Sequence, residues 1–295
     1  MASSVPKTDT VRIGLVQMAC GTDRDAIRDT AETHVRAAAA DGAQIVCLQE
    51  LFDAQYFPQE VDVERYKLAE PLPSPTTKRF AALAAELSVV VIVPIYEEAQ
   101  PGVYFNSVVV FDADGTDLGF YRKNHIPDGP QYLEKYYFTP GDLGYKTFDT
   151  RFGRIGVAIC WDEWFPEVAR IMALQGAQIL FYPSAIGSEP DRSEYSSAEA
   201  WRTVIRSHGI TNGVFVAALN RVGTEGAMTF YGESFVSDPL GEFLAQADDQ
   251  EQVLLADLPM ARVREARELL HFLRDRRTDT YAPLLRKVID PNEGR

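Results

Sequence analysis

The sequence predicts an α/β fold, in which apolar strands alternate with helices, and three observations support this prediction. Short runs rich in β-branched residues, such as Val11–Gln17 and Val89–Tyr96, indicate strands that are buried on both faces. Stretches with helical periodicity, such as Ala81–Leu87, lie between these runs. The third observation is that two segments of the chain, each with a strand, a helix and a second strand, resemble one another.

The two similar segments begin at Val11–Gln17 and at Gly153–Cys160. They end in "DGAQIVCLQE" (Asp41–Glu50) and "QGAQILFYPS" (Gln175–Ser184). In each segment a glycine stands at the turn from the helix into the second strand, as is typical of a parallel βαβ unit. Two related halves favour two sheets packed face to face with helices outside, an α-β-β-α sandwich. The periodicity alone is equally compatible with a single doubly wound sheet.

The remaining elements follow from the same patterns. In chain order, we expect a helix over Ala81–Leu87, strands over Val89–Tyr96 and Tyr104–Asp112, a hairpin turn at Asp114-Gly115, a helix starting at Pro166, strands within Gly213–Asn220 and Glu233–Ala247, and an amphipathic helix over Met260–Asp275. No shift in composition marks an internal boundary. We therefore predict one domain over residues 1–295, with a core of about residues 11–281 and a polar C-terminal arm of about residues 278–295.

Composition and charge argue against several classes of function. The 295 residues carry a formal net charge of −14, which disfavours a nucleic acid or an anionic membrane as a partner. The three cysteines, Cys20, Cys47 and Cys160, do not suggest a disulfide framework. The first ten residues, "MASSVPKTDT", contain no apolar signal segment, and no apolar run is long enough to span a bilayer. We therefore expect a cytoplasmic protein.

Candidate catalytic residues stand where predicted strands end, the edge at which open α/β sheets usually carry their chemistry. Cys160 follows the strand Arg154–Ile159, and Glu50 follows "IVCLQ". Lys123 precedes a Pro/Gly loop, and Glu134 lies among aromatic residues, where burial would raise the pKa of its carboxyl group. A thiol nucleophile needs a base to take its proton, and a cation or amide donors to hold the oxyanion; Glu50 could supply the base and Lys123 the cation. Each residue alone also has a structural interpretation, as an inert buried thiol or a solvated charge.

Motifs of other common chemistries are absent from the sequence. The four histidines are scattered and form no HExxH pattern, so we expect no metal site. The sequence also has no G-x-S-x-G, Walker A or G-x-G-x-x-G segment, which argues against the usual serine hydrolases, P-loop enzymes and dinucleotide binders. We therefore expect chemistry that needs no cofactor.

Three motifs, "LQELF", "YRKNHIPD" and "GVAICWDEWFPE", occur in this order and together resemble the carbon–nitrogen hydrolase family, the nitrilase superfamily. The resemblance covers about residues 11–281 and implies the α-β-β-α sandwich. It implies that Cys160 is the nucleophile, Glu50 the general base and Lys123 the stabiliser of the tetrahedral intermediate. It also implies that Glu134 supports the site and that the chain forms a homo-oligomer. A non-catalytic scaffold on the same fold is the alternative, but it would be expected to lack one of these residues.

Four further stretches resemble the branch of this family that hydrolyses N-carbamoylputrescine to putrescine, CO2 and ammonia, a step of polyamine synthesis. They are "IPDGPQYLEKYYFTPGD", "ICWDEWFPEVAR", "LQGAQILFYPSAIGSEP" and "TFYGESF". A cationic N-carbamoyl amine favours a carboxylate and aromatic walls. We expect Glu189 to bind the ammonium group of this small-molecule substrate. Further candidates for substrate binding are Tyr56, Phe57, Tyr132 and Trp161 as aromatic walls, and Asn106 as a hydrogen-bonding group.

The nearest competing substrate is N-carbamoyl-β-alanine, which ends in a carboxylate. Its recognition would require an arginine, and Arg192 or Arg202 could supply one. The motifs favour the diamine, but a count of nearby charges does not decide between the two substrates.

Overall fold

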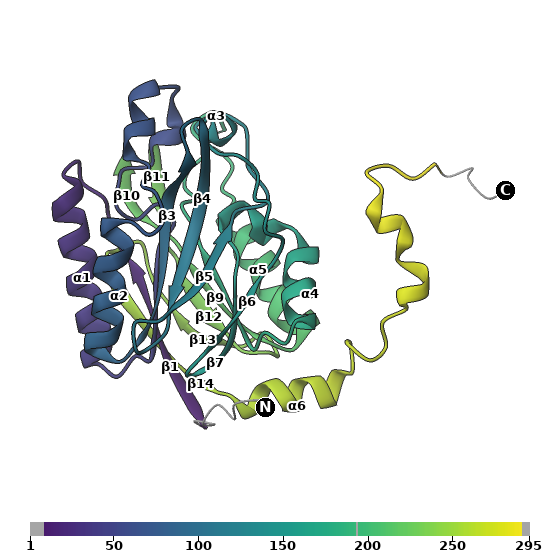
Figure 1. Cartoon of the computed structure of the whole chain (residues 1–295). Coiled ribbons are helices and arrows are strands. Elements are labelled where there is room, and N and C mark those ends of the chain that lie inside the picture. The colour runs from purple at the N-terminus through teal and green to yellow at the C-terminus, as the bar shows by residue number, and fades with distance from the viewer. Residues whose placement is uncertain (1–8, 193, 291–295) are drawn as a thin grey trace.

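Two six-stranded sheets pack face to face and carry helices on their outer faces, which confirms the predicted α-β-β-α sandwich (Figure 1). The computed structural model describes residues 9–192 and 194–290. The first sheet has the order β14-β1-β2-β3-β4-β5 and the second has the order β13-β12-β9-β8-β7-β6. Strands β1–β3 and β7–β9 run parallel, and antiparallel strands form the sheet edges.

The bounds of the elements are as follows. The strands of the first sheet are β1 (Thr10–Gln17), β2 (Ile45–Leu48), β3 (Val90–Gln100), β4 (Val103–Phe111), β5 (Asp117–Arg122) and β14 (Gln252–Pro259). Those of the second sheet are β6 (Thr147–Thr150), β7 (Gly153–Val157), β8 (Ile179–Pro183), β9 (Phe215–Leu219), β12 (Phe235–Ser237) and β13 (Phe243–Gln246). A separate hairpin consists of β10 (Val222–Glu225) and β11 (Met228–Tyr231). The helices are α1 (Arg24–Ala40), α2 (Pro75–Leu87), α3 (Glu134–Tyr137), α4 (Pro166–Leu174), α5 (Ala198–Asn212) and α6 (Ala261–Leu270).

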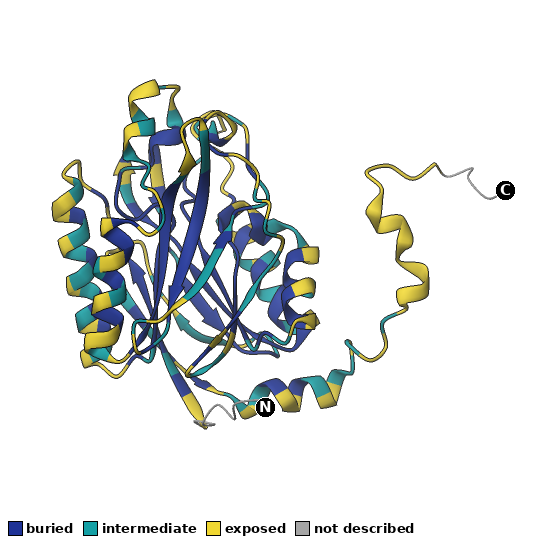
Figure 2. Cartoon of the chain, viewed as in Figure 1, coloured by how far each residue is buried: buried dark blue, intermediate teal, exposed yellow. Residues whose placement is uncertain are grey.

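Strands of the first sheet are apolar on both faces because each face is covered. In β2, Ile45 and Cys47 belong to the core between the two sheets, whereas Val46 and Leu48 pack in the core beneath α1 and α2. This alternation follows from the two-residue period of a strand. Figure 2 shows the two buried sheets between α1 and α2 on one side and α4 and α5 on the other. The continuous apolar runs in the sequence reflect this double coverage.

The two similar segments of the sequence form the predicted βαβ units, β1-α1-β2 and β7-α4-β8, one in each sheet. The turn glycines, Gly42 and Gly176, have φ values of +88° and +95°. Glycine tolerates this left-handed region, which explains its place at both turns. The predicted hairpin turn at Asp114-Gly115 likewise joins the antiparallel pair β4 and β5.

Several elements differ from the predicted ones. Helix α6 ends at Leu270, before the expected Asp275, because His271 adopts a left-handed conformation with φ of +51°. The segment Glu233–Ala247 contains two short strands, β12 and β13, with an irregular register between them. We did not predict α5, whose buried positions include Trp201, His208 and Asn212 and so form a partly polar stripe.

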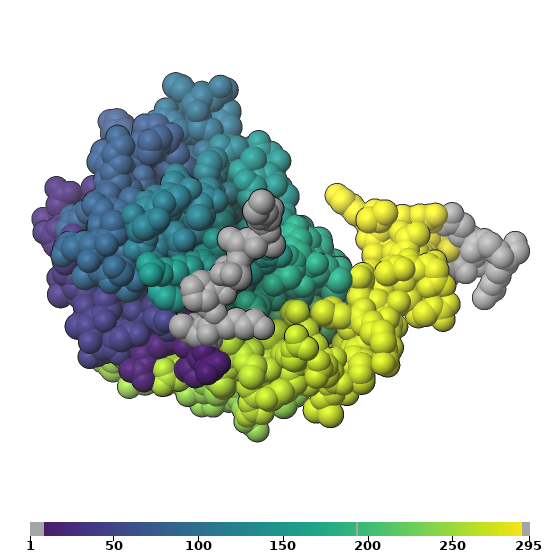
Figure 3. Space-filling view, turned by 60° about the horizontal axis from the view of Figure 1, so that its bottom comes forward, coloured from purple at the N-terminus to yellow at the C-terminus, as the bar shows by residue number. Residues whose placement is uncertain are grey.

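The C-terminal segment leaves the body of the molecule after α6 (Figures 1 and 3). All residues from 277 to 290 are exposed. The segment nevertheless carries large apolar side chains, among them Leu284, Leu285 and Val288.

Candidate active site

Three loops that follow strand ends carry three of the four predicted catalytic residues, and the fourth, Glu134, begins α3. Glu50 lies just beyond β2, Lys123 directly follows β5, and Cys160 starts a short 3-10 turn, Cys160–Trp164, after β7. Strands β2 and β5 belong to the first sheet and β7 to the second. The packing of the two sheets therefore brings these three loops to one end of the sandwich.

Lys123 lies between two carboxylates. Its Nζ donates to Oε1 of Glu50 at 2.8 Å and to Oε2 of Glu134 at 2.7 Å, and all three side chains are buried. An ammonium group has three protons. Since Lys123 has no third acceptor in the part of the chain that the structure describes, one proton is left for another partner.

Two further buried side chains hold these carboxylates. Asn106 Nδ2 donates to Glu50 Oε1 at 2.6 Å, and the hydroxyl group of Tyr56 donates to Glu134 Oε1 at 2.6 Å. The other oxygen of Glu50, Oε2, is buried and has no hydrogen-bond partner among the described residues. A buried acceptor without a partner is unfavourable in the resting protein, so this oxygen is available to a further hydrogen-bond donor.

The charges of this cluster depend on one another. Burial by itself lowers the pKa of Lys123, but Glu134 and Glu50 outweigh burial and raise that pKa well above its usual value. Burial raises the pKa of Glu134, and the positive charge of Lys123 only partly opposes this effect. Lys123 therefore carries a persistent positive charge inside the protein.

Cys160 is buried and has an unusual backbone conformation, with φ of +46°. A residue other than glycine in this region is held there by its surroundings, and such strain is common at functional sites. Burial and the charge of Glu50 raise the pKa of the Cys160 thiol well above its usual value, while Lys123 opposes the rise. The resting residue is thus a neutral thiol, and its activation requires a base.

Asp162 links the turn of Cys160 to the loop of Lys123. Its carboxylate accepts from the backbone N–H of Ile159 at 3.1 Å, from that of His125 at 2.9 Å and from the hydroxyl group of Tyr121 at 2.7 Å. The residues before and after the lysine and those around the cysteine therefore share one buried anchor.

Glu163 forms a second anchor beneath the turn of Cys160. Its side chain accepts from Ser184 Oγ at 2.8 Å and from Trp201 Nε1 at 2.7 Å, and its backbone oxygen lies 2.8 Å from His208 Nε2. Burial raises the pKa of Glu163 well above its usual value. Burial thus favours the neutral form of this side chain, which connects the turn of Cys160 to β8 and α5.

A pocket of about 330 Å³ opens at Cys160. Tyr132, Trp161 and Trp164 form aromatic parts of its wall. Two acidic residues, Asp128 and Glu189, also line it, and one carboxylate oxygen of Glu189 is buried without a hydrogen-bond partner among the described residues. No lysine or arginine belongs to the lining that the described residues form.

Known proteins are similar to this chain in sequence and fold. A family model described as carbon-nitrogen hydrolase matches residues 12–268. The chain belongs to the carbon–nitrogen hydrolase family.

Individual members of the family are similar over nearly the whole chain. The N-carbamoylputrescine amidase of Solanum lycopersicum is 48% identical over 289 residues, which cover 95% of this chain and 96% of that protein. The citrullinase of Francisella tularensis is 38% identical and covers 94% of this chain and 99% of its own length. The crystal structure of a carbon–nitrogen hydrolase from Helicobacter pylori superposes with a TM-score of 0.90 at 42% identity and covers 95% of this chain and 100% of that one.

Some residues of this site in the carbon–nitrogen hydrolase were predicted from the sequence, and others were not. The structure brings together Glu50, Lys123 and Glu134, and it places Tyr132, Trp161 and Glu189 on the pocket wall beside Cys160. Residues that sequence reasoning missed are Asp128, Asp162, Glu163, Trp164, Tyr195 and Ser197. The acid pair in "CWDEWFPE" was a usable signal, because two acidic residues directly after a buried strand end need partners.

Other predicted residues lie away from the pocket wall. Tyr56 and Asn106 sit behind the pocket, where they hold Glu134 and Glu50. Phe57 belongs to an aromatic cluster and packs 5.1 Å, ring centre to ring centre, from Tyr96. Arg202 pairs with Glu233, and Arg192 is exposed. Neither arginine belongs to the pocket lining.

Neither a metal-binding cluster nor a membrane-spanning helix occurs among the described residues. No cluster of three or more histidine, cysteine, aspartate or glutamate side chains there is arranged to hold a metal ion. None of the helices formed by the described residues is sufficiently long and apolar to cross a membrane.

Proposed function

We propose that the protein is a cysteine-dependent amidohydrolase that converts N-carbamoylputrescine to putrescine, CO2 and ammonia. The observation that carries this proposal is the pocket at Cys160, which has two carboxylates, aromatic walls and no cationic residue among the described residues that line it. Such a pocket favours a neutral ureido group attached to a chain that ends in an ammonium group. The similarity to plant N-carbamoylputrescine amidases supports the same substrate.

In the proposed mechanism, Glu50 is the general base for Cys160. Its free oxygen takes the thiol proton as the sulfur attacks the carbonyl carbon of the ureido group. The third proton of Lys123 binds the oxyanion that forms, because its other two protons are held by Glu50 and Glu134. The C–N bond then breaks, and the protonated Glu50 returns its proton to the leaving nitrogen.

The second half of the proposed reaction hydrolyses the thioester. Departure of either ammonia or the diamine leaves an acyl group on Cys160. Glu50 removes a proton from water, the hydroxide attacks the acyl carbon, and the thiolate departs and recovers the proton. The carbamic acid that results breaks down to CO2 and the second amine. Glu134 takes no proton in this scheme; it keeps Lys123 charged and in place.

Selectivity in the proposed function comes from Glu189. One of its carboxylate oxygens is buried and has no partner among the described residues, and an ammonium group would compensate for the hydration that this oxygen has lost. A substrate that ends in a carboxylate, such as N-carbamoyl-β-alanine, would place like charges together in this pocket. Citrulline carries both an ammonium and a carboxylate group at its far end, and the described residues of the pocket wall offer no cation to the carboxylate.

The test is ammonia release by purified protein with N-carbamoylputrescine, N-carbamoyl-β-alanine and citrulline in parallel, with the Cys160→Ala variant as the blank. We expect strong turnover of N-carbamoylputrescine alone. The Glu189→Gln variant should raise KM for this substrate and should narrow its advantage over the other two. Preference of the wild-type protein for N-carbamoyl-β-alanine or citrulline would contradict the proposed substrate, and equal turnover by the Cys160→Ala variant would contradict the chemistry.

We also propose that the chain forms a homo-oligomer through its C-terminal segment. Leu285 and Val288 are 92% and 82% exposed, although such side chains are stabilised by burial. The segment projects away from its own body (Figure 3), which leaves a second copy as the surface that could bury them. Light scattering should show a smaller assembly for the Leu284→Asp/Leu285→Asp variant than for the wild type. An unchanged mass would contradict this proposal.

A cytoplasmic location completes the proposed function. Cys20, Cys47 and Cys160 are all free thiols, which suits a reducing compartment. Fractionation of cells that express the tagged protein tests this location, and recovery with the membrane fraction would contradict it.

A further inference from the structure

Arg221 has the largest fully buried charged side chain among the described residues, and the proposed mechanism gives it no role. It follows β9 and lies directly beneath the loop that carries Glu50, with its side chain fully buried. Its Nη2 donates to the backbone oxygens of Glu50 at 2.9 Å and Leu51 at 2.7 Å, and its Nη1 donates to that of Ala54 at 3.0 Å. One guanidinium group thus binds three carbonyl groups of a single loop.

The loop that Arg221 binds has a strained backbone. Leu51, the residue after Glu50, has φ of +48°, in the region that residues with a side chain rarely adopt. Such a conformation persists only when surrounding contacts hold it. The hydrogen bonds from Arg221 to the carbonyl groups of Glu50 and Leu51 lie on both sides of this strained residue's N–Cα bond, where they can fix it.

Glu225 orients Arg221 and extends the contact to the far end of the loop. Its carboxylate oxygens lie 2.9 and 3.1 Å from Arg221 Nη1, and Oε2 accepts from the backbone N–H of Tyr56 at 2.5 Å. The hydroxyl group of Tyr56 in turn holds Glu134. The buried pair Arg221–Glu225 therefore supports both carboxylates that flank Lys123.

We propose that Arg221 is a positioning residue for the general base: it fixes the backbone of Glu50 and Leu51 and thereby holds the Glu50 carboxylate where it can exchange a proton with Cys160. This inference rests on the proposed function, in which Glu50 is the base. Arginine suits the role because its planar guanidinium presents several donors in a fixed arrangement, whereas a lysine ammonium is a single point on a flexible stem.

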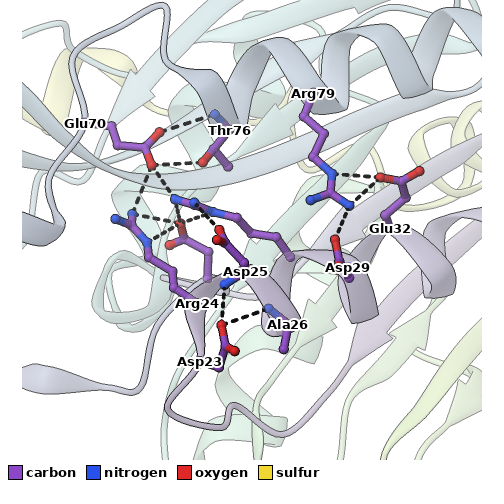
Figure 4. Close-up of polar contacts among 11 residues, drawn as sticks. Asp23, Arg24, Asp25, Ala26, Asp29, Glu32, Glu70, Thr76 and Arg79 are labelled. Carbon is purple, nitrogen blue, oxygen red and sulfur yellow. Dashed lines mark hydrogen bonds and ion pairs between the residues drawn. The ribbon is translucent and has the colours of Figure 1, made fainter.

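The outer side of the same loop has an independent anchor. Asp53 pairs with Arg24 at 2.8 Å and with Arg28 at 2.9 Å, both on α1. Figure 4 shows the start of α1, where Arg24 also pairs with Glu70, which in turn accepts a hydrogen bond from Thr76. Because the outer anchor remains when Arg221 is altered, the loop should shift at Glu50 and not detach as a whole.

The substitution that tests the proposal is Arg221→Lys, which keeps the charge next to Glu225. A small displacement of a catalytic group is enough to slow an enzyme by about 100-fold. We expect kcat to fall by about this factor with KM nearly unchanged. Arg267→Lys is the matched control, since Arg267 also donates to three backbone carbonyl groups, those of Asn212, Gly213 and Ala177, but on α6. It should leave kcat unchanged.

A second readout separates positioning of Glu50 from a general structural role and needs no substrate. The rate at which iodoacetamide alkylates Cys160 is measured for the wild type, Glu50→Gln, Arg221→Lys and the double variant. In the wild-type background, Glu50→Gln should change the alkylation rate by a measurable factor. If Arg221 acts through Glu50, the same substitution should change the rate much less in the Arg221→Lys background. Where Arg221→Lys does not yield folded protein, Glu225→Gln replaces it and should show the same pattern with a smaller fall in kcat.

The outcomes are distinct. A selective fall in kcat together with a diminished effect of Glu50→Gln on alkylation would support the proposal. An unchanged kcat, or an equal effect of Glu50→Gln in both backgrounds, would overturn it. Absence of turnover of every N-carbamoyl compound by the wild type would instead refute the proposed function, while the alkylation rates would still decide whether Arg221 positions Glu50.

Discussion

The two βαβ units, β1-α1-β2 and β7-α4-β8, are alike at one end and different at the other. At the helix-to-strand turn, Arg12 Nη1 donates to the backbone oxygen of Asp41, and Arg154 Nη1 donates to that of Gln175, each at 2.9 Å. Gln44 and Gln178 accept from the backbone N–H groups of the same two arginines. The turn end thus repeats its contacts nearly residue by residue.

The opposite ends of the units, where the parallel strands finish, do not repeat. When the two units are aligned on their shared pattern, Cys160 of the second unit corresponds to Met18 of the first, and Glu50 of the first corresponds to Ser184 of the second. Each unit therefore contributes one of the two side chains that we propose to be reactive, and from a different strand of the unit. In the proposed mechanism, the contacts at the turn end of both units stabilise the fold, whereas at the strand end one unit supplies the base and the other supplies the nucleophile.

The largest loss of activity should come from replacing the proposed nucleophile. Cys160→Ala should abolish ammonia release and leave the protein folded, because alanine fills most of the same buried volume. Met18→Leu, at the corresponding buried position, should keep activity near that of the wild type. Ammonia assays with circular dichroism check both variants, and comparable activity losses in the two would contradict the division of roles.

Replacing the proposed base, Glu50, should lower activity strongly, although less than replacing Cys160. Glu50→Gln should lower kcat by about 100-fold or more, since it removes the base but keeps the contact with Asn106. Ser184→Ala removes only a hydroxyl group that bonds to Glu163 and should cost stability of about 1 kcal/mol. Steady-state kinetics and urea unfolding measure the two effects. A Glu50→Gln variant with wild-type kcat would show that another group is the base.

Glu163 allows a pH test of the second unit. Because its pKa is raised in the folded protein, the proton that it binds stabilises the fold fully at low pH, and this stabilisation is lost as the pH rises above the value of an unfolded glutamate. In Glu163→Gln this loss is absent. The amide group can donate to Ser184 Oγ, which in turn lies 3.2 Å from the backbone oxygen of Tyr182.

We therefore expect the free energy of unfolding of Glu163→Gln, relative to the wild type, to increase with pH above about 4.5, by up to about 1.4 kcal/mol per pH unit. Urea unfolding of both proteins at a series of pH values measures this difference. A difference that stays constant, or that decreases with pH, would show that Glu163 is not held in its neutral form.

The smallest effects should appear at the repeated turns. Gly42→Ala and Gly176→Ala both place a side chain at positive φ and should cost about 1–2 kcal/mol of stability without changing kcat. The added Cβ at Gly176 would lie 2.8 Å from Arg154 Nη1, whereas at Gly42 the nearest atom, Arg12 Nη1, is 3.7 Å away. Thermal unfolding should therefore show the larger loss for Gly176→Ala, and the opposite order would contradict the comparison.

Much of the fold could be predicted because its signals are local. The paired turns, the apolar strands and the reactive residues at strand ends all lie within short stretches of sequence. Arg221 could not be recognised in this way, because its partners at Glu50 and Leu51 are some 170 positions away along the chain. The left-handed conformations of Leu51 and Cys160 were equally hidden, since they are imposed by tertiary contacts.

The pocket shows the same limit. Tyr132, Trp161 and Glu189 were identified from motifs, but their neighbours Trp164 and Tyr195 were not, although Trp164 lies on the same turn as Trp161. Tyr56 was expected on this wall and instead supports Glu134 from behind. An aromatic residue in a motif indicates proximity to the site, but only the packing of loops determines which surface its ring occupies.

In the proposed mechanism, Cys160 forms a covalent acyl intermediate. Its most direct test is mass spectrometry of the protein after acid quenching during turnover of N-carbamoylputrescine, with digestion to locate the modified residue. We predict that the peptide containing Cys160 carries an acyl group, whose mass also tells whether ammonia or the diamine leaves first. Modification at another residue, or undiminished turnover by the Cys160→Ala variant, would contradict the proposed role of Cys160 as the nucleophile.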